Sequence, residues 1–319
     1  MAGVEPTPQS GISNVIAILS DKGGVGKTSA TANLAGHMAA GDLKVLVVDL
    51  DKSGSLAIPM GMIGQGDDGK GIVDALAGRR STLEVVEEVR DNLDWVPGGT
   101  ELAVLMDMYY RNQQLQARGG MAAVFASLLA PLAANYDLVL IDTPPSNLEL
   151  QEVALYAAAF AITPTNPGPQ GLEGLRRTAP IIRELQRHRN PRLEWLGAII
   201  TKQPVRASRL IRVTREILAS SAIPVFEATI RLVPALAEQM ETRGVLSHEL
   251  AEEADSERAG LLASLRAKKN QESTTLAWPA LDRRTGSQLA DDYAALTREL
   301  CQQVGQRRKA MLAGAGGVR

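Results

Sequence analysis

Cysteine, aromatic residues and long apolar runs are all scarce in this sequence. Its 319 residues include a single cysteine, Cys301, which excludes both a disulfide framework and a multi-cysteine cluster site. No apolar run approaches the roughly 18 to 20 residues that a membrane-spanning helix requires. Aromatic residues make up only 3% of the chain, and this scarcity disfavours a surface that stacks on the bases of single-stranded nucleic acid.

The composition is otherwise that of a globular protein. Hydrophobic residues make up 45% of the chain, enough to bury one large core or two modest ones. The net charge of -2 says little about partners by itself. The first fourteen residues lack the basic start and apolar core of a signal peptide. We therefore interpret residues 1–14 as a polar tail and expect a cytoplasmic protein.

Apolar runs of β type alternate with helical patterns from Val15 to about Val233. Such alternation predicts an α/β fold, with a mostly parallel, twisted sheet and helices on both of its faces. Between the second and third runs, residues 61–78 contain six glycines and predict a mobile loop with a short helix. The expected strands are Val15–Leu19, Val45–Leu50, Leu93–Val96, Leu138–Ile141, Ala159–Pro164, Trp195–Ile200 and Val225–Ile230.

The stretch from Val15 to Ser29, VIAILSDKGGVGKTS, has the features of a phosphate-binding loop. It combines a buried strand, a glycine-rich turn and a helix opened by Lys27 and Thr28, which is the context that such a loop requires. The glycines let backbone N–H groups and the helix N-terminus approach phosphate oxygens. Lys27 would reach the terminal phosphates, and the Thr28 hydroxyl would hold Mg²⁺. The alternative, a glycine-rich turn with lysines for solubility, does not account for the flanking strand and helix.

The loop departs from the general pattern G-x-x-x-x-G-K-[ST] at its first position, where the chain has Asp21, and it carries a second lysine, Lys22. The segment KGGVGKT resembles the deviant Walker A loop of the ParA/MinD ATPase superfamily. In that family the extra lysine reaches the nucleotide of a partner subunit. The resemblance thus implies an ATP-bound homodimer, with ATP and Mg²⁺ as cofactors. The residues that it assigns to the nucleotide are Lys22, Gly23, Gly24, Val25, Gly26, Lys27, Thr28 and Ser29.

Two carboxylates follow the second expected strand, in the segment VVDLDKSG. Asp49 and Asp51 lie two residues apart, on the same side of the strand's carboxyl end, where ligands bind in open α/β sheets. A solvated strand end is the alternative. The ParA family commonly has DLDPQGN at this point, which implies that Asp51 positions the attacking water and Asp49 organises the magnesium shell. Lys52 and Ser53 replace the family's proline and glutamine.

The segment YDLVLIDTPPS has the features of a Walker B element. Four apolar residues precede Asp142, which would hold Mg²⁺ through water beside the phosphate-binding loop. Asp142 follows Lys27 by 115 residues, and the segment matches the DxPPS form of the ParA family. The two prolines then leave the sheet in a stiff turn that can sense a γ-phosphate.

Two later segments resemble the ParA family more weakly. Residues 172–175, LEGL, match the opening of the family's next helix, where Glu173 is expected to cap the helix rather than to catalyse. The segment TIRLVPALAEQMETRGVL, from Thr229, resembles the region that flanks the adenine, although the family's IPRN wording is absent. Arg231 and Pro234 are therefore the candidate nucleotide contacts in this region.

Arginine is concentrated between Arg176 and Arg215. This segment holds ten arginines and Lys202 against two glutamates, a net charge of +9 (11 minus 2), so the rest of the chain sums to -11. A helix starting near Ala207 would align a basic stripe, which has the electrostatic footprint of duplex phosphate binding. The alternative is a solvated face that pairs with the acidic segment Glu249 to Glu257. The candidate DNA-binding residues are Arg206, Arg209, Arg212 and Arg215.

We expect a single ParA-like ATPase domain over residues 15–319. Residues 247–280 resemble the family least and are interpreted as an insertion. A final helix, at about 287–311, would dock on the core through apolar residues spaced by three and four. The expected docking face consists of Leu289, Tyr293, Leu296, Leu300 and Val304.

The resemblance implies a ParA-type ATPase that partitions DNA and associates with the nucleoid. ATP would close the homodimer, which would bind nonspecific double-stranded DNA until a ParB-type centromere-binding protein stimulates hydrolysis. The candidate catalytic residues are Lys22, Lys27 and Asp51. The candidate magnesium ligands are Thr28, Asp49 and Asp142.

Three alternatives remain open. A MinD-like membrane-positioning ATPase needs a C-terminal amphipathic helix, whereas the last eight residues are mostly glycine and alanine, so we expect no stable membrane association. An electron-donating relative similar to the nitrogenase iron protein needs cysteines at the dimer interface, and Cys301 is badly placed for that. A ParA-like positioning ATPase for a protein cargo uses the same machinery, and the sequence does not separate it from DNA partition.

Overall fold

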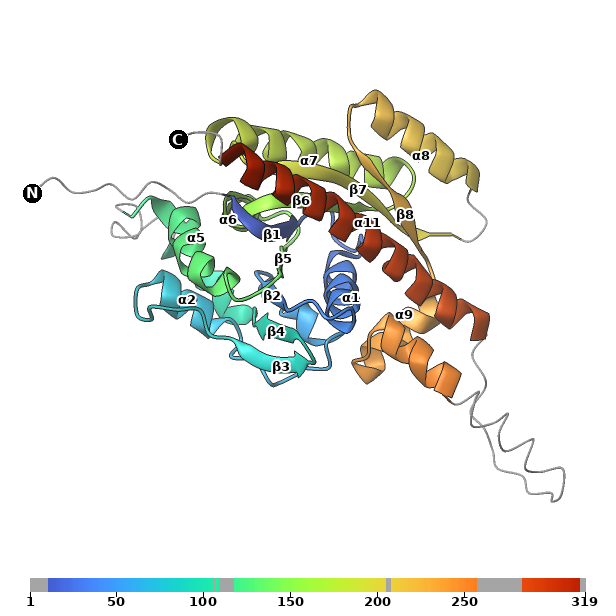
Figure 1. Cartoon of the computed structure of the whole chain (residues 1–319), viewed down its shortest axis with the longest axis horizontal. Helices are drawn as coiled ribbons and strands as arrows, with labels where there is room; N and C mark the ends of the chain where they lie inside the picture. The colour runs from blue at the N-terminus through green and yellow to red at the C-terminus, as the bar shows by residue number, and fades with distance from the viewer. Residues whose placement is uncertain (1–10, 106, 109–117, 205–207, 257–282, 316–319) are drawn as a thin grey trace, which may run out of the picture.

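A computed structural model of the chain describes residues 11–105, 107–108, 118–204, 208–256 and 283–315. For residues 283–287 and 312–315 it describes the backbone alone. The described chain is built on an eight-stranded sheet with strand order β3-β4-β2-β5-β1-β6-β7-β8 (Figure 1). The strands are β1 (Ile12–Ile18), β2 (Val45–Asp49), β3 (Val86–Arg90), β4 (Leu93–Val96), β5 (Leu138–Asp142), β6 (Ala158–Thr165), β7 (Glu194–Gln203) and β8 (Val225–Arg231).

The expected α/β architecture is confirmed, with one addition. Each of the seven expected apolar runs forms a strand, and those strands pair in parallel. The sequence patterns do not predict β3, which pairs antiparallel with β4 at the edge of the sheet. Its sequence, VEEVR, is only partly buried, so it lacks the continuous apolar run that identifies a central strand.

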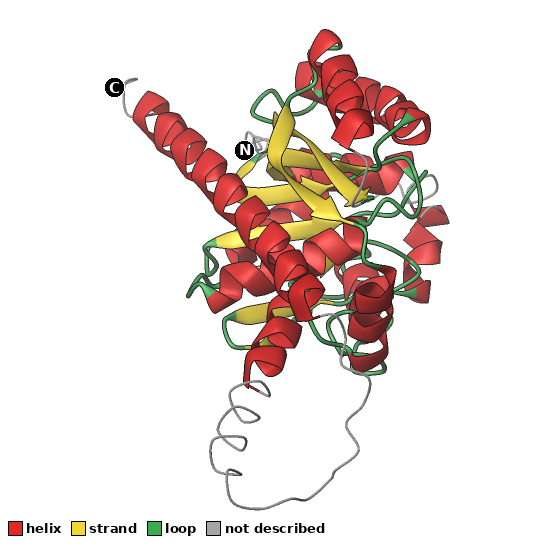
Figure 2. Cartoon of the chain, turned by 90° about the vertical axis from the view of Figure 1, so that its right-hand side faces the viewer, coloured by secondary structure: helices red, strands yellow, loops and turns green. Residues whose placement is uncertain are grey.

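Helices cover both faces of the sheet (Figures 1 and 2). Alternate residues of β1 point to opposite faces, with Val15 and Ala17 in one apolar cluster and Ile16 and Ile18 in the other. The first cluster includes residues of α2, α5, α6 and α7, and the second includes residues of α1, α9 and α11. The helices are α1 (Lys27–Ala40), α2 (Lys70–Leu76), α5 (Gly120–Ala133), α6 (Leu148–Ala157), α7 (Pro169–His188), α8 (Ser208–Ser220), α9 (Pro234–Arg243) and α11 (Arg283–Ala315), with 3₁₀ turns η1 (Ser55–Ala57) and η2 (Thr100–Val104).

The long helix α11 packs against β8 and α1 and crosses one face of the sheet (Figures 1 and 2). Its apolar residues at spacings of three and four are buried, as a docking face requires. They are Leu289, Tyr293, Leu296, Leu300 and Val304. Of the segment interpreted as an insertion, residues 247–256 form a helix, and the remainder lies outside the described residues.

The order of the strands brings three functional segments to one edge of the sheet. Strand β5 lies between β1 and β2, with Asp142 opposite Ile18 on one side and Asp49 on the other. The carboxyl ends of β1, β2 and β5 therefore meet where the glycine-rich loop enters α1. Among the described residues, no helix combines the length and apolar character needed to cross a bilayer.

Candidate nucleotide-binding site

The glycine-rich loop connects β1 to α1 in the geometry of a phosphate cradle. Gly24 and Gly26 have φ angles of 71° and 85°, a left-handed conformation that glycine adopts without the steric cost of a side chain. Gly26 immediately precedes α1, so the unpaired N–H groups of the helix N-terminus face the loop. Backbone and helix dipole together make this a site for a polyanion.

Lys27 is held inside the loop. Its side chain is only 6% exposed, and its ammonium group donates a hydrogen bond to the Lys22 carbonyl at 3.3 Å. Burial lowers the pKa of Lys27, while the nearby carboxylates of Asp142, Asp51 and Asp21 raise it. The cation is thus positioned where it can neutralise a bound phosphate.

Asp142 is fully buried at the end of β5 and is bound by two hydroxyls of α1. Thr28 Oγ1 donates to one carboxylate oxygen at 2.7 Å, and Thr31 Oγ1 donates to the other at 3.2 Å. Burial raises the pKa of Asp142 to about 6, an effect that the Thr28 hydrogen bond and the Lys27 charge oppose. Thr28 and Asp142, which are both candidate magnesium ligands, are therefore in direct contact.

Asp49 and Asp51 lie beside this pair. Asp49 is fully buried, and one of its oxygens accepts the Asp51 N–H at 2.8 Å. The other oxygen, Oδ2, is buried without a partner in the described part of the chain. Burial, reinforced by the charge of Asp142, raises the pKa of Asp49 well above its usual range. Asp51 is 9% exposed and accepts the Ser53 N–H at 2.9 Å.

The oxygens of Asp49 and Asp142 suit Mg²⁺ better than a metal ion that is coordinated by protein side chains alone. Within the described ranges, no group of three or more His, Cys, Asp or Glu side chains is arranged to hold a metal ion. Mg²⁺ instead usually keeps several waters and takes only one or two carboxylates together with substrate phosphates. The unpartnered Asp49 oxygen beside the Thr28–Asp142 pair is consistent with such a water-rich shell.

The structure adds Gly98 to this site, although the sequence did not single it out. A Cβ atom at position 98 would lie 2.7 Å from the Asp49 carbonyl oxygen and 2.9 Å from the Asp51 carbonyl oxygen. Only glycine lets the loop after β4 pass this close to the two carboxylate residues. The segment Pro97–Gly98–Gly99, which follows an expected strand, was the available signal.

Lys22 lies against the N-terminal half of α7. Its ammonium group donates to the side-chain oxygen of Gln170 at 2.8 Å. Gly174 supports this contact, because a Cβ there would approach the Lys22 Cβ to 3.1 Å. Gln170 is a second contact that the sequence did not predict.

The start of α7 corrects one expectation. The helix begins at Pro169 rather than at LEGL, so Glu173 lies beyond its first turn. Glu173 pairs with Arg177 at 3.3 Å and lies 3.9 Å from Arg176. It does not cap the helix, because it lies outside the first turn and its carboxylate faces these arginines.

A small cavity of about 80 Å³ lies beside the phosphate loop. It is bordered by the start of α1, the end of β7, the segment after β8, α9 and α11. Arg231 lines it, whereas Pro234, the first residue of α9, does not. Its lining includes Gly26, Ser29, Asn33, Thr201, Lys202, Leu232, Val233, Leu289 and Tyr293.

The guanidinium of Arg231 is engaged by α11. It donates to both carboxylate oxygens of Asp292, at 2.6 and 2.8 Å, and to Gln288 at 2.5 Å. The Arg231 N–H also donates to Asp292 at 3.0 Å. The Asp292 contact raises the pKa of Arg231. Arg231 thus fastens the cavity wall to α11, a role that the sequence did not predict.

Comparison with known proteins places this geometry in a family. A model of the AAA domain matches residues 13–195. The chromosome partitioning protein ParA of Myxococcus xanthus is 31% identical over 223 residues, covering 69% of this chain and 75% of the relative. The sporulation initiation inhibitor protein Soj of Bacillus subtilis is 30% identical over 208 residues, covering 64% and 78%.

Solved structures agree with the sequence relatives. Cobyrinic acid a,c-diamide synthase from Mycobacterium smegmatis, with bound ADP and magnesium, has a TM-score of 0.60 at 25% identity, covering 69% of this chain and 87% of that one. The septum site-determining protein MinD from Pyrococcus horikoshii, complexed with Mg-ADP, has a TM-score of 0.61 at 22% identity, covering 92% and 97%. The chain belongs to the ParA/MinD superfamily of P-loop ATPases.

The match to the AAA domain model covers only some of the candidate residues. The matched residues 13–195 contain the phosphate loop, Asp49, Asp51 and Asp142, but they end before α8 and Arg231. The expected cofactors, ATP and Mg²⁺, are of the kind that the solved superfamily structures contain. The segment matched by the AAA domain model therefore includes neither the arginine stripe of α8 nor Arg231.

The arginine stripe maps mainly to α8. Arg206 lies outside the described residues. Arg209 and Arg212 are exposed, and Arg212 is 3.7 Å from Glu216 in the next turn. Arg215 is more enclosed, because it donates to the Glu227 carbonyl at 2.7 Å and lies 3.5 Å from the Glu227 carboxylate. The stripe therefore offers two solvent-facing cations in the described region.

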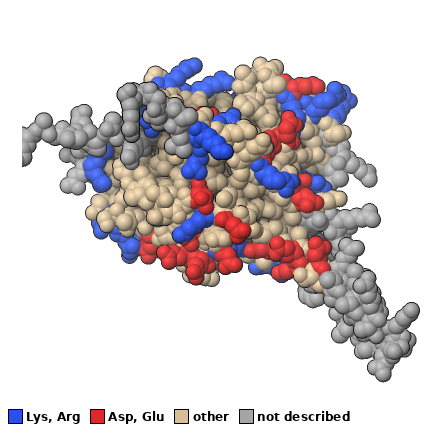
Figure 3. All heavy atoms as spheres, in the orientation of Figure 1, with Lys and Arg blue, Asp and Glu red and all other residues tan. Residues whose placement is uncertain are grey.

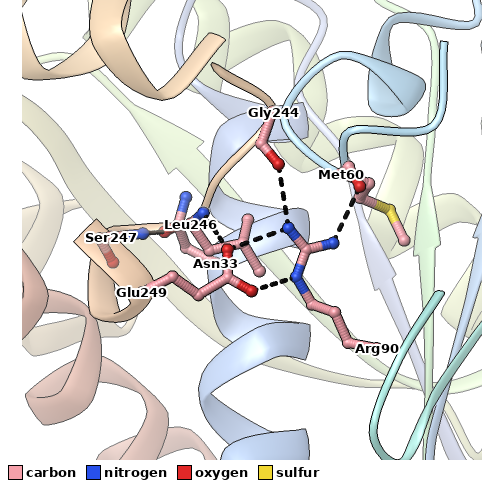
Figure 4. Close-up of polar contacts among 7 residues, drawn as sticks. All are labelled: Asn33, Met60, Arg90, Gly244, Leu246, Ser247 and Glu249. Atoms are coloured by element: carbon pink, nitrogen blue, oxygen red, sulfur yellow. Dashed lines mark hydrogen bonds and ion pairs between the residues drawn. The ribbon is translucent and has the colours of Figure 1, made fainter. Parts of the chain in front are cut away.

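Charge is segregated on the face drawn in Figure 3. Lys and Arg gather along the upper edge, where α7 and α8 lie, and Asp and Glu along the lower edge, where β3 and α9 lie. The alternative pairing of the arginines with the acidic segment is wrong for the described residues. Glu249 pairs with Arg90 (Figure 4), and Glu253 pairs with Arg243 at 2.6 Å.

Proposed function

We propose that this chain is an ATP-dependent DNA-partition ATPase of the ParA type. The observation that carries the proposal is the presence in one chain of a two-lysine phosphate loop and an exposed arginine pair, Arg209 and Arg212. The first supports a nucleotide switch, and the second supports a duplex-binding surface that such a switch can control. The 31% identity to a chromosome partitioning protein supports the same function.

ATP would bind along the backbone of residues 22–29, with Lys27 on its terminal phosphates. Mg²⁺ would be held by Thr28 and, through water, by Asp142 and Asp49, and it would neutralise charge on the phosphates. Asp51 would orient the attacking water, since only one of its oxygens is used by the Ser53 N–H. Lys22 would neutralise developing charge on the nucleotide of a second protomer.

The cavity beside the loop would receive the adenine base. Its walls combine apolar side chains such as Leu289 with the polar ends of β7 and β8, which suits a flat ring with a polar edge. Arg231 would support the wall rather than contact the phosphates, because Asp292 already neutralises its charge. Pro234 stays a predicted neighbour of this region.

The ATP-bound homodimer would bind nonspecific double-stranded DNA through α8 and so associate with the nucleoid. Arginine forks suit phosphate oxygens, and a surface that reads only the backbone is insensitive to sequence. Release would follow hydrolysis stimulated by a ParB-type centromere-binding partner. The chain would then act in the cytoplasm without a stable membrane attachment.

Equilibrium binding to an unrelated duplex tests this function directly. The protein is titrated with Mg²⁺-ATP, with Mg²⁺-ADP and without nucleotide, at low and at moderate salt. We expect binding only with ATP and a marked loss with salt, because arginine–phosphate contacts release counterions. Equal binding in all nucleotide states, or none in any state, would contradict the proposal.

A further inference from the structure

The backbone of Asp21, directly before Lys22, is held from two sides. Thr178 of α7 accepts the Asp21 N–H at 3.0 Å. Ser146, from the loop between β5 and α6, donates its hydroxyl to the Asp21 carbonyl at 2.8 Å. The Asp21 carboxylate lies 3.7 Å from Arg177 of α7. Every polar group of Asp21 therefore has a partner outside the phosphate loop.

Ser146 makes its contact in an unfavourable backbone conformation. Its φ angle is 52°, which is uncommon for residues with a Cβ and costs free energy that surrounding contacts must offset. The side chain is otherwise exposed, so burial of apolar surface does not explain the conformation. The left-handed conformation instead places the Ser146 hydroxyl where it donates a hydrogen bond to the Asp21 carbonyl.

The loop that carries Ser146 begins at the magnesium side of the site. Thr143, next to Asp142, donates its hydroxyl to the Ile18 carbonyl of β1 at 2.9 Å. Gln151 of α6, a buried residue, donates to the Pro144 carbonyl at 3.0 Å. The loop is thus fixed at both of these points before it reaches Ser146.

We propose that Ser146 is a positioning residue that links the Asp142 side of the site to Lys22 through the backbone of Asp21. This inference rests on the proposed role of Lys22 across a dimer. When the loop after Asp142 moves, the hydrogen bond from Ser146 moves the backbone of Asp21 with it. Lys22 follows, because a peptide bond joins it to Asp21. Ser146 therefore determines whether the Lys22 ammonium can leave Gln170 and reach the nucleotide of a second protomer.

The test compares Ser146→Ala and Ser146→Gly with wild type in the full-length chain. Both variants lose the hydroxyl, but glycine also relieves the left-handed strain that alanine keeps. Ser221→Ala is the matched control, because that exposed serine directly follows α8 and its hydroxyl donates only to the Ile217 carbonyl of that helix. The measurements are ATP affinity, the dissociation constant of the ATP-bound dimer, and amide hydrogen exchange of residues 19–26 without nucleotide.

We expect both Ser146 variants to bind ATP with wild-type affinity but to dimerise about fivefold more weakly, the change that one neutral hydrogen bond produces. Exchange across residues 19–26 should accelerate by a similar factor, and the Gly variant should be the more stable of the two. Wild-type dimerisation or unchanged exchange in both variants would overturn the inference. Failure of the proposed role of Lys22 is distinguishable, because wild type itself would then not dimerise with ATP, while the exchange measurement would still decide whether the Ser146 link exists.

Discussion

Three buried or nearly buried carboxylates, Asp49, Asp51 and Asp142, meet Lys27 at the end of the central strands. Burial disfavours the charged form of Asp49 and Asp142 and raises the pKa of both. A divalent cation near them would reverse that effect, since it favours ionised carboxylates. The site is therefore electrostatically prepared for magnesium and phosphate together, which is the combination that nucleotide hydrolysis needs.

Replacement of Asp51 by alanine should separate binding from hydrolysis. We expect ATP affinity to stay within about threefold of wild type and turnover to fall roughly 100-fold or more, because Asp51 would act on the attacking water. Phosphate release under single-turnover conditions measures the loss. The exposed neighbour Lys52→Ala is the control, and wild-type turnover in Asp51→Ala would assign the water to another residue.

The sequence did not predict the contacts in the site between residues that lie far apart along the chain. The phosphate loop, Asp49 and Asp142 follow local apolar strands, so their positions could be predicted from pattern alone. The partner of Lys22, Gln170, lies 148 residues away, and no local signal connects them. Gly98 and Ser146 were missed for the same reason, since their roles arise from close approach in the folded chain.

Helix α1 connects the phosphate loop to the C-terminal third of the chain. A Cβ at Gly36 would lie 2.3 Å from Leu246 Cδ1 and 2.9 Å from the His248 ring. Asn33, one turn earlier, accepts the Ser247 N–H at 2.9 Å (Figure 4). The small residue at position 36 is what allows the segment before helix 247–256 to pack on α1.

Gly36→Ala should therefore destabilise the protein by about 1 to 3 kcal/mol, because an added methyl group overpacks this contact. The matched control is Gly305→Ala in α11, where nothing lies within 4 Å of the added Cβ. That change should be neutral or stabilising by up to about 1 kcal/mol through helix propensity. Urea denaturation of both variants measures the difference, and equal effects would contradict the packing argument.

Reversal of two charges on α8, Arg209→Glu with Arg212→Glu, should weaken duplex binding about tenfold or more and reduce its salt dependence. ATP affinity should be unchanged, since α8 does not line the cavity beside the phosphate loop. Arg79→Glu with Arg80→Glu gives the same change in net charge at another exposed site. Fluorescence anisotropy with a labelled duplex compares the two, and equal losses would mean that net charge, not α8, determines binding.

The boundaries of a strand or helix could be predicted where an apolar pattern marks it. They could not be predicted where contacts with distant residues stabilise it. The central strands and α1 agree with their patterns to within a few residues. Strand β3 is stabilised by its pairing with β4 and by Arg90, which donates to the Met60 and Gly244 carbonyls (Figure 4). Its charged sequence does not reveal those partners.

A histidine pair joins α1, near the start of the fold, to the C-terminal third of the chain. His37 of α1 and His248 have ring centroids 4.8 Å apart, and the His37 ring stacks on Tyr293 of α11 at 6.4 Å. Burial, together with the charges of the neighbouring His248 and Arg298, lowers the pKa of His37 to about 4. The junction therefore depends on neutral imidazole.

The stability of this junction should depend on pH. An unfolded histidine binds a proton near pH 6.5, whereas folded His37 does so only near pH 4. Below about pH 6.5 the unfolded state takes up more protons, so the stabilisation present above that pH is lost as the pH falls. The loss should be on the order of 1 kcal/mol between about pH 7.5 and about pH 5, allowing for the partial exposure of the ring.

Urea denaturation at both pH values, for wild type and His37→Gln, measures this effect. The variant should lose less stability on acidification than wild type does. His188→Gln, at an exposed position on α7, should behave like wild type. The same pH dependence in all three proteins would assign the acid sensitivity to other groups.

We propose that ATP converts this chain from monomer to dimer through Lys22. The most direct test is light scattering of wild type and Lys22→Ala with Mg²⁺-ATP and with Mg²⁺-ADP, with the exposed Lys70→Ala as control. We predict that wild type and the control double in mass with ATP only, and that Lys22→Ala remains monomeric with either nucleotide while still binding ATP. A normal ATP-dependent dimer of Lys22→Ala, or a wild-type chain that stays monomeric with ATP, would contradict the account.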